Sequence, residues 1–317
     1  MFGLGKKKKV DGRTVLLLDI ESGSVGAALV RLSAAQQPRM FGARRAQVPV
    51  EHTRTGAGLV QSIGQVLKKT LYEIAEAATR LRFHPKTAAM GTVSGVSVIM
   101  ASPWGTPNLE AGQPDFLEEV VSSTNVGVRT SFGDIPLSLY TSAGAAAYGA
   151  RTLFGQEPAL LCTVGGEVTE LIALDEHGVA AHATAPLGSN ALLRTLRAHG
   201  GYSFAEARSA ARLPFDTPHL QAPFRSSGEH FASQFADAAR EFAAPGQYSR
   251  IRVIAGEPAG EWYARALSTS QALGTLFPHG EVRTLRPHHL YPFVVAHVSP
   301  PDIPLLLGAL FIDSQPM

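Results

Sequence analysis

A glycine pair at Gly165–Gly166 separates two apolar runs and is a candidate site for binding chemistry. The runs extend from Leu160 to Leu174 as LLCTVGGEVTELIAL, so we expect two strands joined by a hairpin turn. Backbone N–H groups at a tip without side chains can approach phosphate oxygens closely, which makes the tip a candidate anion site. Taken alone, the pattern favours an ordinary hairpin turn, because short glycine motifs recur by chance.

A second stretch of the same kind lies at Thr14–Leu32, TVLLLDIESGSVGAALVRL. An apolar strand again ends in a short serine and glycine tip, Ser22–Ser24, and turns into another apolar strand. Asp19 and Thr163, which precede the two tips, are 144 residues apart (163 minus 19), about half of the chain. The spacing predicts an internal duplication. We further expect the two tips to face each other across one cleft.

Other stretches predict the elements that would position these tips. Apolar residues recur at three- and four-residue steps over Gly58–Leu81, which predicts a helix that covers a sheet face. Gln47–His52 is expected to be a short extended piece, and Gly95–Pro103 a strand. Ile135–Thr152 should be a strand end followed by an alanine-rich helix. The phenylalanine stripe within Phe224–Phe242 indicates a core-facing helix rather than a ligand pocket.

The stretch from Gly105 to Thr130 has a weaker pattern. Asn108–Pro114 is expected to be a loop, Phe116–Val121 a short helix and Val126–Arg129 an edge strand. Too few residues lie here for an independent core.

The ordered set of motifs resembles the actin/Hsp70/sugar-kinase superfamily over nearly the whole chain. Within it, the sequence is closest to the PilM family of type IV pilus assembly proteins and the FtsA family of cell-division proteins. The resemblance is carried by the basic leader MFGLGKKKKV running into LLLDIESGSVGAALV, SVIMASPW at Ser97–Trp104, VGGEVTELIAL, APLGSNALLRTL at Ala185–Leu196, IRVIAGEPAG at Ile251–Gly260 and DIPLLLGALF at Asp302–Phe311.

The resemblance implies an α/β, actin-like (ribonuclease H-like) fold that is duplicated into two lobes. A basic N-terminal tail over residues 1–13 would precede a first lobe over residues 14–152 and a second lobe over residues 153–317. The inserted subdomain of FtsA and PilM would be reduced to about residues 105–130. Any partner contact that the family makes through that subdomain is therefore not carried over.

The resemblance also implies a cleft for ATP and Mg²⁺. Asp19 would face the metal through water, because a carboxylate is the hard oxygen ligand that Mg²⁺ prefers. The alternative is a strand-ending aspartate that caps its own turn. The residues expected to bind the nucleotide are Ser22, Gly23, Ser24, Gly165, Gly166, Thr169, Gly188 and Gly256.

Several residues depart from the family's pattern. Glu21 stands where the family usually has glycine, and Gly26 where lysine is common, and both changes weaken phosphate binding. Thr163 occupies the position of a metal-directed carboxylate, so we expect slow or absent hydrolysis. Glu167 and Glu170 are the nearby acids that could take over this catalytic role, although solvent-facing positions on the strand are the favoured expectation.

Composition excludes several other classes of protein. The 317 residues, 45% of them hydrophobic, can bury one large core or two ordinary ones. A formal charge of +2 is too small to indicate a nucleic-acid partner. The single cysteine, Cys162, excludes an internal disulfide and fits a reducing cytoplasm. The scattered histidines have no acidic or cysteine partner at metal-ligand spacing.

Membrane insertion is not indicated. No uncharged apolar run reaches the roughly 18–20 residues of a spanning helix. Lys6–Lys9 are not followed by the long apolar stretch of a secretory signal. We expect these lysines to form a solvated tail rather than a lipid contact.

The expected function is a PilM/FtsA-like cytoplasmic scaffold of a membrane-associated assembly machinery, in type IV pilus assembly or cell division, with weak or lost ATP binding. A PilN-like or FtsZ-like partner would recruit it to the inner face of the cell membrane, so its membrane contact would be indirect. Association of identical protomers stays open. One alternative is an active Mg-dependent actin-like ATPase that uses Asp19 with Glu167 or Glu170. The other is a sugar or acetate kinase, disfavoured because no extra acidic base for a substrate hydroxyl is apparent.

Overall fold

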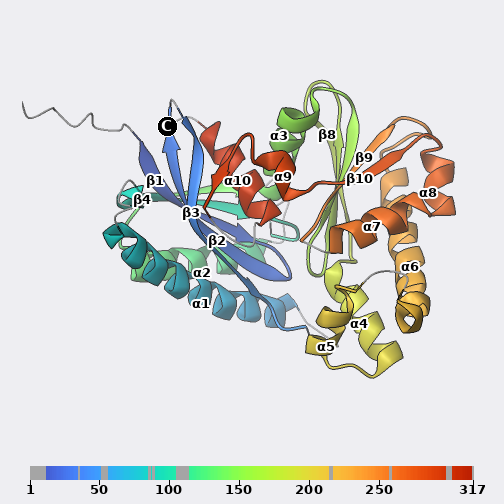
Figure 1. Cartoon of the computed structure of the whole chain (residues 1–317), viewed down its shortest axis with the longest axis horizontal. Coiled ribbons are helices and arrows are strands. Elements are labelled where there is room, and N and C mark those ends of the chain that lie inside the picture. Colours follow the sequence, from blue (N-terminus) through green and yellow to red (C-terminus); the bar gives the residue numbers. More distant parts are fainter. Residues whose placement is uncertain are drawn as a thin grey trace, which may run out of the picture.

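The computed structural model describes residues 12–34, 36–50, 56–84, 87, 90–104, 114–213, 217–256, 259–297 and 302–315. The lysine tail and the loop expected at residues 108–114, except for Pro114, lie outside the described residues. The described elements form two β-sheets that lie side by side (Figure 1).

The first sheet has six strands in the order β11-β3-β2-β1-β4-β5. The antiparallel hairpin predicted at Thr14–Leu32 is confirmed as β1 and β2, while β1, β4 and β5 run parallel. The strands are β1 (Arg13–Ile20), β2 (Ser24–Ser33), β3 (Gln36–Gln47), β4 (Val93–Met100), β5 (Leu137–Thr141) and β11 (Val295–Ala296).

Strand β3 corrects the short extended piece expected at Gln47–His52, because it spans Gln36–Gln47 and ends where that piece was expected to begin. Residues 51 and 52 lie outside the described residues. Pro38, Gly42 and paired arginines interrupt its apolar pattern, so the sequence carries little strand signal there. It is nevertheless paired along β2, and this long-range pairing decides its structure.

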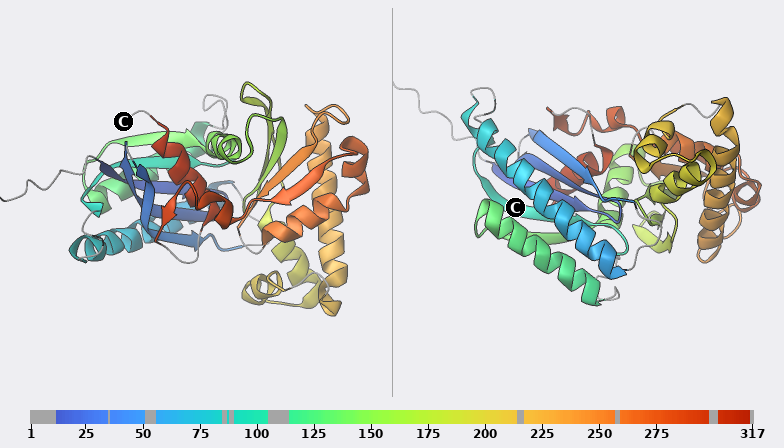
Figure 2. Two further views of the ribbon diagram at one scale, coloured as in Figure 1. Left: turned by 45° about the horizontal axis from the view of Figure 1, so that its top comes forward. Right: turned by 90° about the horizontal axis from the view of Figure 1, so that it is seen from below.

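Two long helices cover one face of the first sheet. They are α1 (Gly56–Phe83) and α2 (Pro114–Phe132), which lie side by side in the right view of Figure 2. Helix α1 confirms the prediction over Gly58–Leu81. Trp104, expected to be a packing residue, is buried in the same core.

Helix α2 corrects the expectation of a short helix followed by an edge strand at Val126–Arg129. It is one continuous helix, with Val120, Thr124 and Val128 buried at steps of four residues. Burial of this helical stripe therefore outweighs the β propensity of the valines.

The second sheet has five strands in the order β10-β9-β6-β7-β8. The hairpin predicted at Leu160–Leu174 is confirmed as the antiparallel pair β6 and β7, and β9 runs parallel to β6. The strands are β6 (Ala159–Val164), β7 (Thr169–Leu174), β8 (Val179–Ala185), β9 (Arg250–Ile254) and β10 (Glu281–Thr284).

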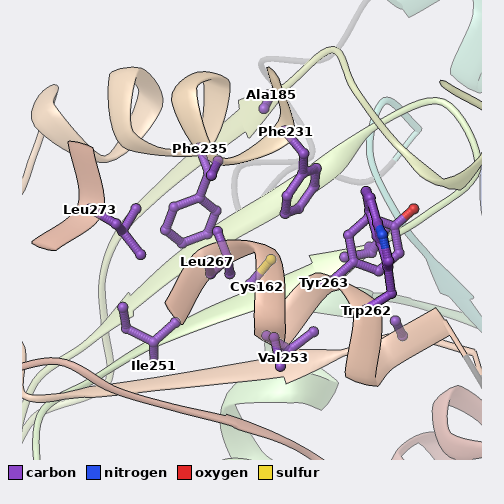
Figure 3. Close-up of a cluster of buried hydrophobic side chains, with 14 of the residues drawn as sticks. Cys162, Ala185, Phe231, Phe235, Ile251, Val253, Trp262, Tyr263, Leu267 and Leu273 are labelled. Carbon is purple, nitrogen blue, oxygen red and sulfur yellow. The ribbon is translucent and has the colours of Figure 1, made fainter. Parts of the chain in front are cut away.

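Helices enclose the core on one face of the second sheet. They are α4 (Ser189–Gly200), α5 (Phe204–Ala210), α6 (Gln221–Arg240), α7 (Ala259–Ser268) and α8 (Gln271–Leu276), with a short 3-10 turn at Pro218–Leu220. Figure 3 shows Phe231 of α6 beside Tyr263 of α7, with Phe235 further along the same core, and the predicted phenylalanine stripe is confirmed as core. Cys162 lies in this core, and burial raises the pKa of its thiol.

Three helices join the sheets: α3 (Ser142–Phe154), α9 (Pro287–Leu290) and α10 (Ile303–Asp313). One buried cluster contains Leu17 of the first sheet, Ile172 of the second and Leu306 of α10. Strand β11 and α10 fall within residues 153–317 but pack on the first sheet. The two sheets therefore share a hydrophobic core. Of the helices in the described ranges, none is both long and apolar enough to cross a membrane.

Candidate functional site

The two hairpin tips lie where the sheets meet. Parallel strands of the first sheet end at Ile20, Met100 and Thr141, and those of the second end at Val164 and Ile254. Loops that follow such carboxyl ends are where open α/β sheets bind ligands. We name Glu21–Gly23 loop 1, Gly165–Val168 loop 2, and the region between them the seam.

The two loops touch directly. The N–H of Glu167 donates a hydrogen bond to Ser22 Oγ at 2.9 Å. Gly23 and Gly166 pack backbone against backbone, so that a Cβ added to either would overlap the Cα of the other. The prediction that the tips face each other is confirmed. Their contact leaves no room for a phosphate group between Gly23 and Gly166.

Arg45 of β3 occupies the first-sheet side of the seam. Its Nη2 lies 2.5 Å from Asp19 Oδ2, and its Nε lies 2.5 Å from Asp302 Oδ2. Its Nη1 donates to Ser24 Oγ at 2.6 Å and lies 3.5 Å from Glu21 Oε1. One guanidinium therefore binds two carboxylates closely and stands near a third.

Burial and crowding of like charges set the ionisation of this group. Burial raises the pKa of Asp19, although Arg45 opposes the shift, and the negative charges of Asp302 and Glu170 add to it. Burial likewise raises the pKa of Glu21 to about 7. Burial disfavours the charged guanidinium, but Asp302 and Asp19 outweigh it, so the pKa of Arg45 lies above its ordinary value. Arg45 is therefore a permanent cation inside the seam.

Sequence reasoning missed Arg45 as a site residue, although one signal for it exists. Gly26, where the family commonly has lysine, pairs with Arg45 across β2 and β3. A Cβ on Gly26 would lie 2.6 Å from Arg45 Nη2, so the glycine leaves room for the guanidinium. Arg45 of the neighbouring strand β3 therefore supplies a positive charge beside Gly26, where β2 itself has none.

Glu170 is buried, which corrects the favoured expectation that it faces solvent. It is 2% exposed, and its Oε1 accepts hydrogen bonds from the N–H and Oγ of Ser102 at 3.0 and 2.9 Å. Its Oε2 accepts from Ser142 Oγ, and His182 Nε2 lies 3.5 Å from Oε1. The carboxylate of β7 therefore ties the second sheet to the ends of β4 and β5.

Glu167 is engaged as well. Its carboxylate accepts a two-pronged hydrogen bond from Arg194 and a third from Asn190, both in α4. Neither Glu167 nor Glu170 is thus a freely solvated strand residue. Both carboxylates hold protein groups in place.

The remaining predicted nucleotide-binding residues occupy different settings. Thr169 Oγ1 donates to the carbonyl of Leu187 at 2.6 Å. Gly188 lies against loop 2, where an added Cβ would be 2.5 Å from the carbonyl oxygens of Gly165 and Gly166. Gly256 follows β9 at the same edge of the sheet, but it is exposed, and no atom lies within 4 Å of an added Cβ.

The ATP and Mg²⁺ implied by the resemblance do not fit this arrangement. Asp19 is bonded to a guanidinium, loop 1 touches loop 2, and Thr163 has no carboxylate to offer. The hydroxyl of Thr163 is buried and has no hydrogen-bond partner among the residues that the structure describes. Within the described residues, no three His, Cys, Asp or Glu side chains are arranged to hold a metal ion.

No protein-family model matches the sequence, and no curated protein matches it either. Solved structures match over nearly the whole chain. EutJ, an ethanolamine utilization protein from Carboxydothermus hydrogenoformans, is 16% identical, with a TM-score of 0.55 over 95% of this chain and 89% of that one. A chain of the PilM-PilN type IV pilus biogenesis complex is 13% identical, with a TM-score of 0.58 over 95% and 99%.

A ROK family glucokinase from Streptomyces griseus, solved with glucose and AMPPNP, is 15% identical, with a TM-score of 0.52 over 94% and 98%. The chain therefore has the α/β, actin-like two-lobe fold that the resemblance implied.

Proposed function

We propose that this actin-like chain is a PilM-like scaffold of a membrane-associated assembly machinery and that it has weak or no ATP binding. The observation that carries the proposal is the filled seam, in which Arg45 bridges Asp19 and Asp302 while Gly23 touches Gly166. The chain would act in the cytoplasm, where a PilN-like membrane protein recruits it to the membrane. The similar fold in the PilM-PilN complex supports this choice over a division role with an FtsZ-like partner.

The energetic argument concerns what a nucleotide would have to displace. Opening the seam for Mg·ATP requires separating loop 1 from loop 2 and removing Arg45 from Asp19. Breaking a buried ion pair costs about 3–5 kcal/mol. Because each 1.4 kcal/mol is tenfold in affinity, this cost alone weakens binding by about two to nearly four orders of magnitude.

A thermal-shift titration with Mg·ATP tests the proposal. We expect no saturable rise in melting temperature at micromolar nucleotide and none, or a marginal one, at millimolar nucleotide. MgCl₂ alone at the same ionic strength is the control. A rise that saturates in the micromolar range would contradict the proposal, because ligand stabilisation grows with the ratio of ligand concentration to Kd.

The scaffold role needs a test of its own. The tagged chain would be cross-linked in membranes of its native cells, and the cytoplasmic segment of each captured membrane protein would be synthesised and titrated against the pure chain. We expect one such segment to bind saturably and without nucleotide. Failure of every membrane-protein segment, with soluble enzymes captured instead, would refute the scaffold role.

An active ATPase is the second candidate: the filled seam opposes it, but Arg45 supplies a cation that could act on a phosphate if the seam opened. The guanidinium lies over Gly26, where the family commonly has a lysine. Release of inorganic phosphate from ATP, lost in an Arg45→Met variant that remains folded, would support this candidate.

A further inference from the structure

The carboxylate of Glu167 is held in a geometry that also suits a phosphate group. Arg194 Nη1 and Nη2 lie 2.8 and 2.7 Å from Oε2 and Oε1. Asn190 Nδ2 donates to Oε1 at 2.9 Å, and Asn190 is only 3% exposed. A guanidinium fork binds carboxylates and phosphates in the same two-pronged way.

Loop 2, which contains Glu167, also covers the N-terminus of α4. The N–H groups of Ser189 and Asn190 donate to the carbonyl oxygens of Gly165 and Gly166, both at 2.8 Å. The N-cap residue, Gly188, provides no side-chain cap. These carbonyl oxygens take up N–H groups that a helix N-terminus would otherwise offer to an anion. Loop 2 therefore brings two carbonyl oxygens and one carboxylate to the end of a single helix.

We propose that the side chains of Arg194 and Asn190 form an oxyanion seat on the first two turns of α4, and that Glu167 is its built-in occupant. The class of ligand for the seat is a phosphate or a carboxylate. The inference rests on the proposed function, because it explains how this chain keeps phosphate groups out of the seam. A tethered carboxylate competes at an effective concentration of millimolar or more, which excludes weakly bound free anions.

The occupied seat also fixes the contact between the sheets. The backbone N–H of Glu167 binds Ser22 Oγ of loop 1, while its side chain is anchored to α4. Removing the carboxylate should therefore lower the melting temperature by loosening loop 2, and an added anion that refills the seat should restore it.

Chemical rescue tests the seat. Glu167→Ala should melt at a lower temperature than the natural chain and recover saturably with millimolar inorganic phosphate or acetate, measured against sodium chloride at equal ionic strength. The natural chain should show no such saturable response. Glu176→Ala is the matched control, because Glu176 is an exposed glutamate of the β7–β8 turn in the same half of the chain. It should behave as the natural chain does.

A second pair of variants keeps the test decisive. Glu167→Ala combined with Arg194→Ala should lose the anion response, because the guanidinium fork is gone. If Glu167→Ala does not fold, Glu167→Gln takes its place and should be stabilised by phosphate more than the natural chain. No response in any folded Glu167 variant would overturn the seat, as would an equal response in the natural chain. Micromolar Mg·ATP binding by the natural chain would instead overturn the proposed function. The rescue result would still decide whether the seat exists.

Discussion

Around Arg45, one positive charge faces three carboxyl groups, those of Asp19, Glu21 and Asp302. One ionised carboxylate balances the charge of the guanidinium, so ionisation of all three would leave two negative charges in excess. This excess agrees with the pKa of Glu21, which burial raises to about 7 while Asp19 adds to the shift. Arg45 therefore favours the ionised form of the carboxyl groups around it, and the charge of Glu21 also changes with pH near 7.

Replacing Arg45 should destabilise the protein strongly. Arg45→Met leaves buried carboxylates without their cation, and we expect the unfolding free energy to fall by about 3–5 kcal/mol at pH 8. The loss should be smaller at pH 5, where carboxyl groups with raised pKa values take up protons. Urea unfolding at both pH values measures it.

Arg44→Met is the matched control for this change. Arg44 is exposed, and its Nη1 donates to the adjacent carbonyl of Ala43. Its loss should cost less than about 0.5 kcal/mol. Equal effects of the two substitutions would show that Arg45 has no special role in the seam.

Glu21→Gln should change how stability depends on pH. The carboxyl pKa rises from 4.5 to about 7 on folding, so the folded chain keeps a proton that the unfolded chain releases. Stability of the natural chain should therefore fall as pH rises from about 4.5 to 7 and then level off.

The glutamine variant lacks this dependence. It should match the natural chain near pH 4.5 and exceed it above pH 7 by at most about 3 kcal/mol in unfolding free energy. Urea midpoints between pH 5 and 8 measure the difference. Parallel pH profiles of the two proteins would contradict the raised pKa.

At the scale of elements, the contact between the hairpin tips requires glycine on both sides. Gly166→Ala would place a Cβ on the Cα of Gly23, and the loops must then separate. We expect a loss of about 1–3 kcal/mol in unfolding free energy, as for other overpacked sites. Thermal or urea unfolding measures it.

Gly274→Ala serves as the control for the same chemical change. Gly274 lies in α8, and no atom is within 4 Å of an added Cβ. Alanine favours a helix by about 1 kcal/mol over glycine, so this variant should be as stable as the natural chain or more so. A harmless Gly166→Ala would mean that the tips do not touch in solution.

Local patterns were sufficient for the elements with a clear period. The two hairpins, helix α1 and the phenylalanine face of α6 could all be predicted. The hairpin strands are continuous apolar runs that end at glycine-containing turns, and burial in the helices recurs every three to four residues. Strand β3 and helix α2 could not. In β3 the apolar pattern is broken, and in α2 tertiary burial overrides the preference of valine for strands.

Some contacts of the candidate site could likewise be predicted from the sequence, and others could not. The meeting of Ser22 and Gly23 with loop 2 could be predicted from the duplicated tips. The partners of Arg45 could not, because they are 26 and 257 residues away in the sequence. The pairing register of β2 with β3 positions Arg45, and the packing of α10 on the first sheet brings Asp302 to it. Neither feature can be predicted from local spacing.

At the scale of the whole molecule, the shared core should make unfolding cooperative. Leu306 of α10 is fully buried in the cluster that contains residues of both sheets, whereas Leu276 of α8 is buried in the core of the second sheet alone. Leu306→Ala and Leu276→Ala should each cost about 2–5 kcal/mol in unfolding free energy. Both should shift the same single transition in calorimetry.

Separate transitions, one moved by each substitution, would contradict this expectation. They would show that the two sheets unfold independently in spite of the buried side chains that α3 and α10 place between them.

The return of β11 and α10 to the first sheet also has a consequence for synthesis on the ribosome. Strand β3 obtains its outer neighbour only when Val295–Ala296 have emerged, and the opposite face of β1 is covered by α10 later still. During most of translation, the nascent first sheet therefore presents an open edge and an uncovered apolar face, features that favour association with other chains. A chaperone that shields nascent polypeptides should engage this protein until α10 has left the exit tunnel.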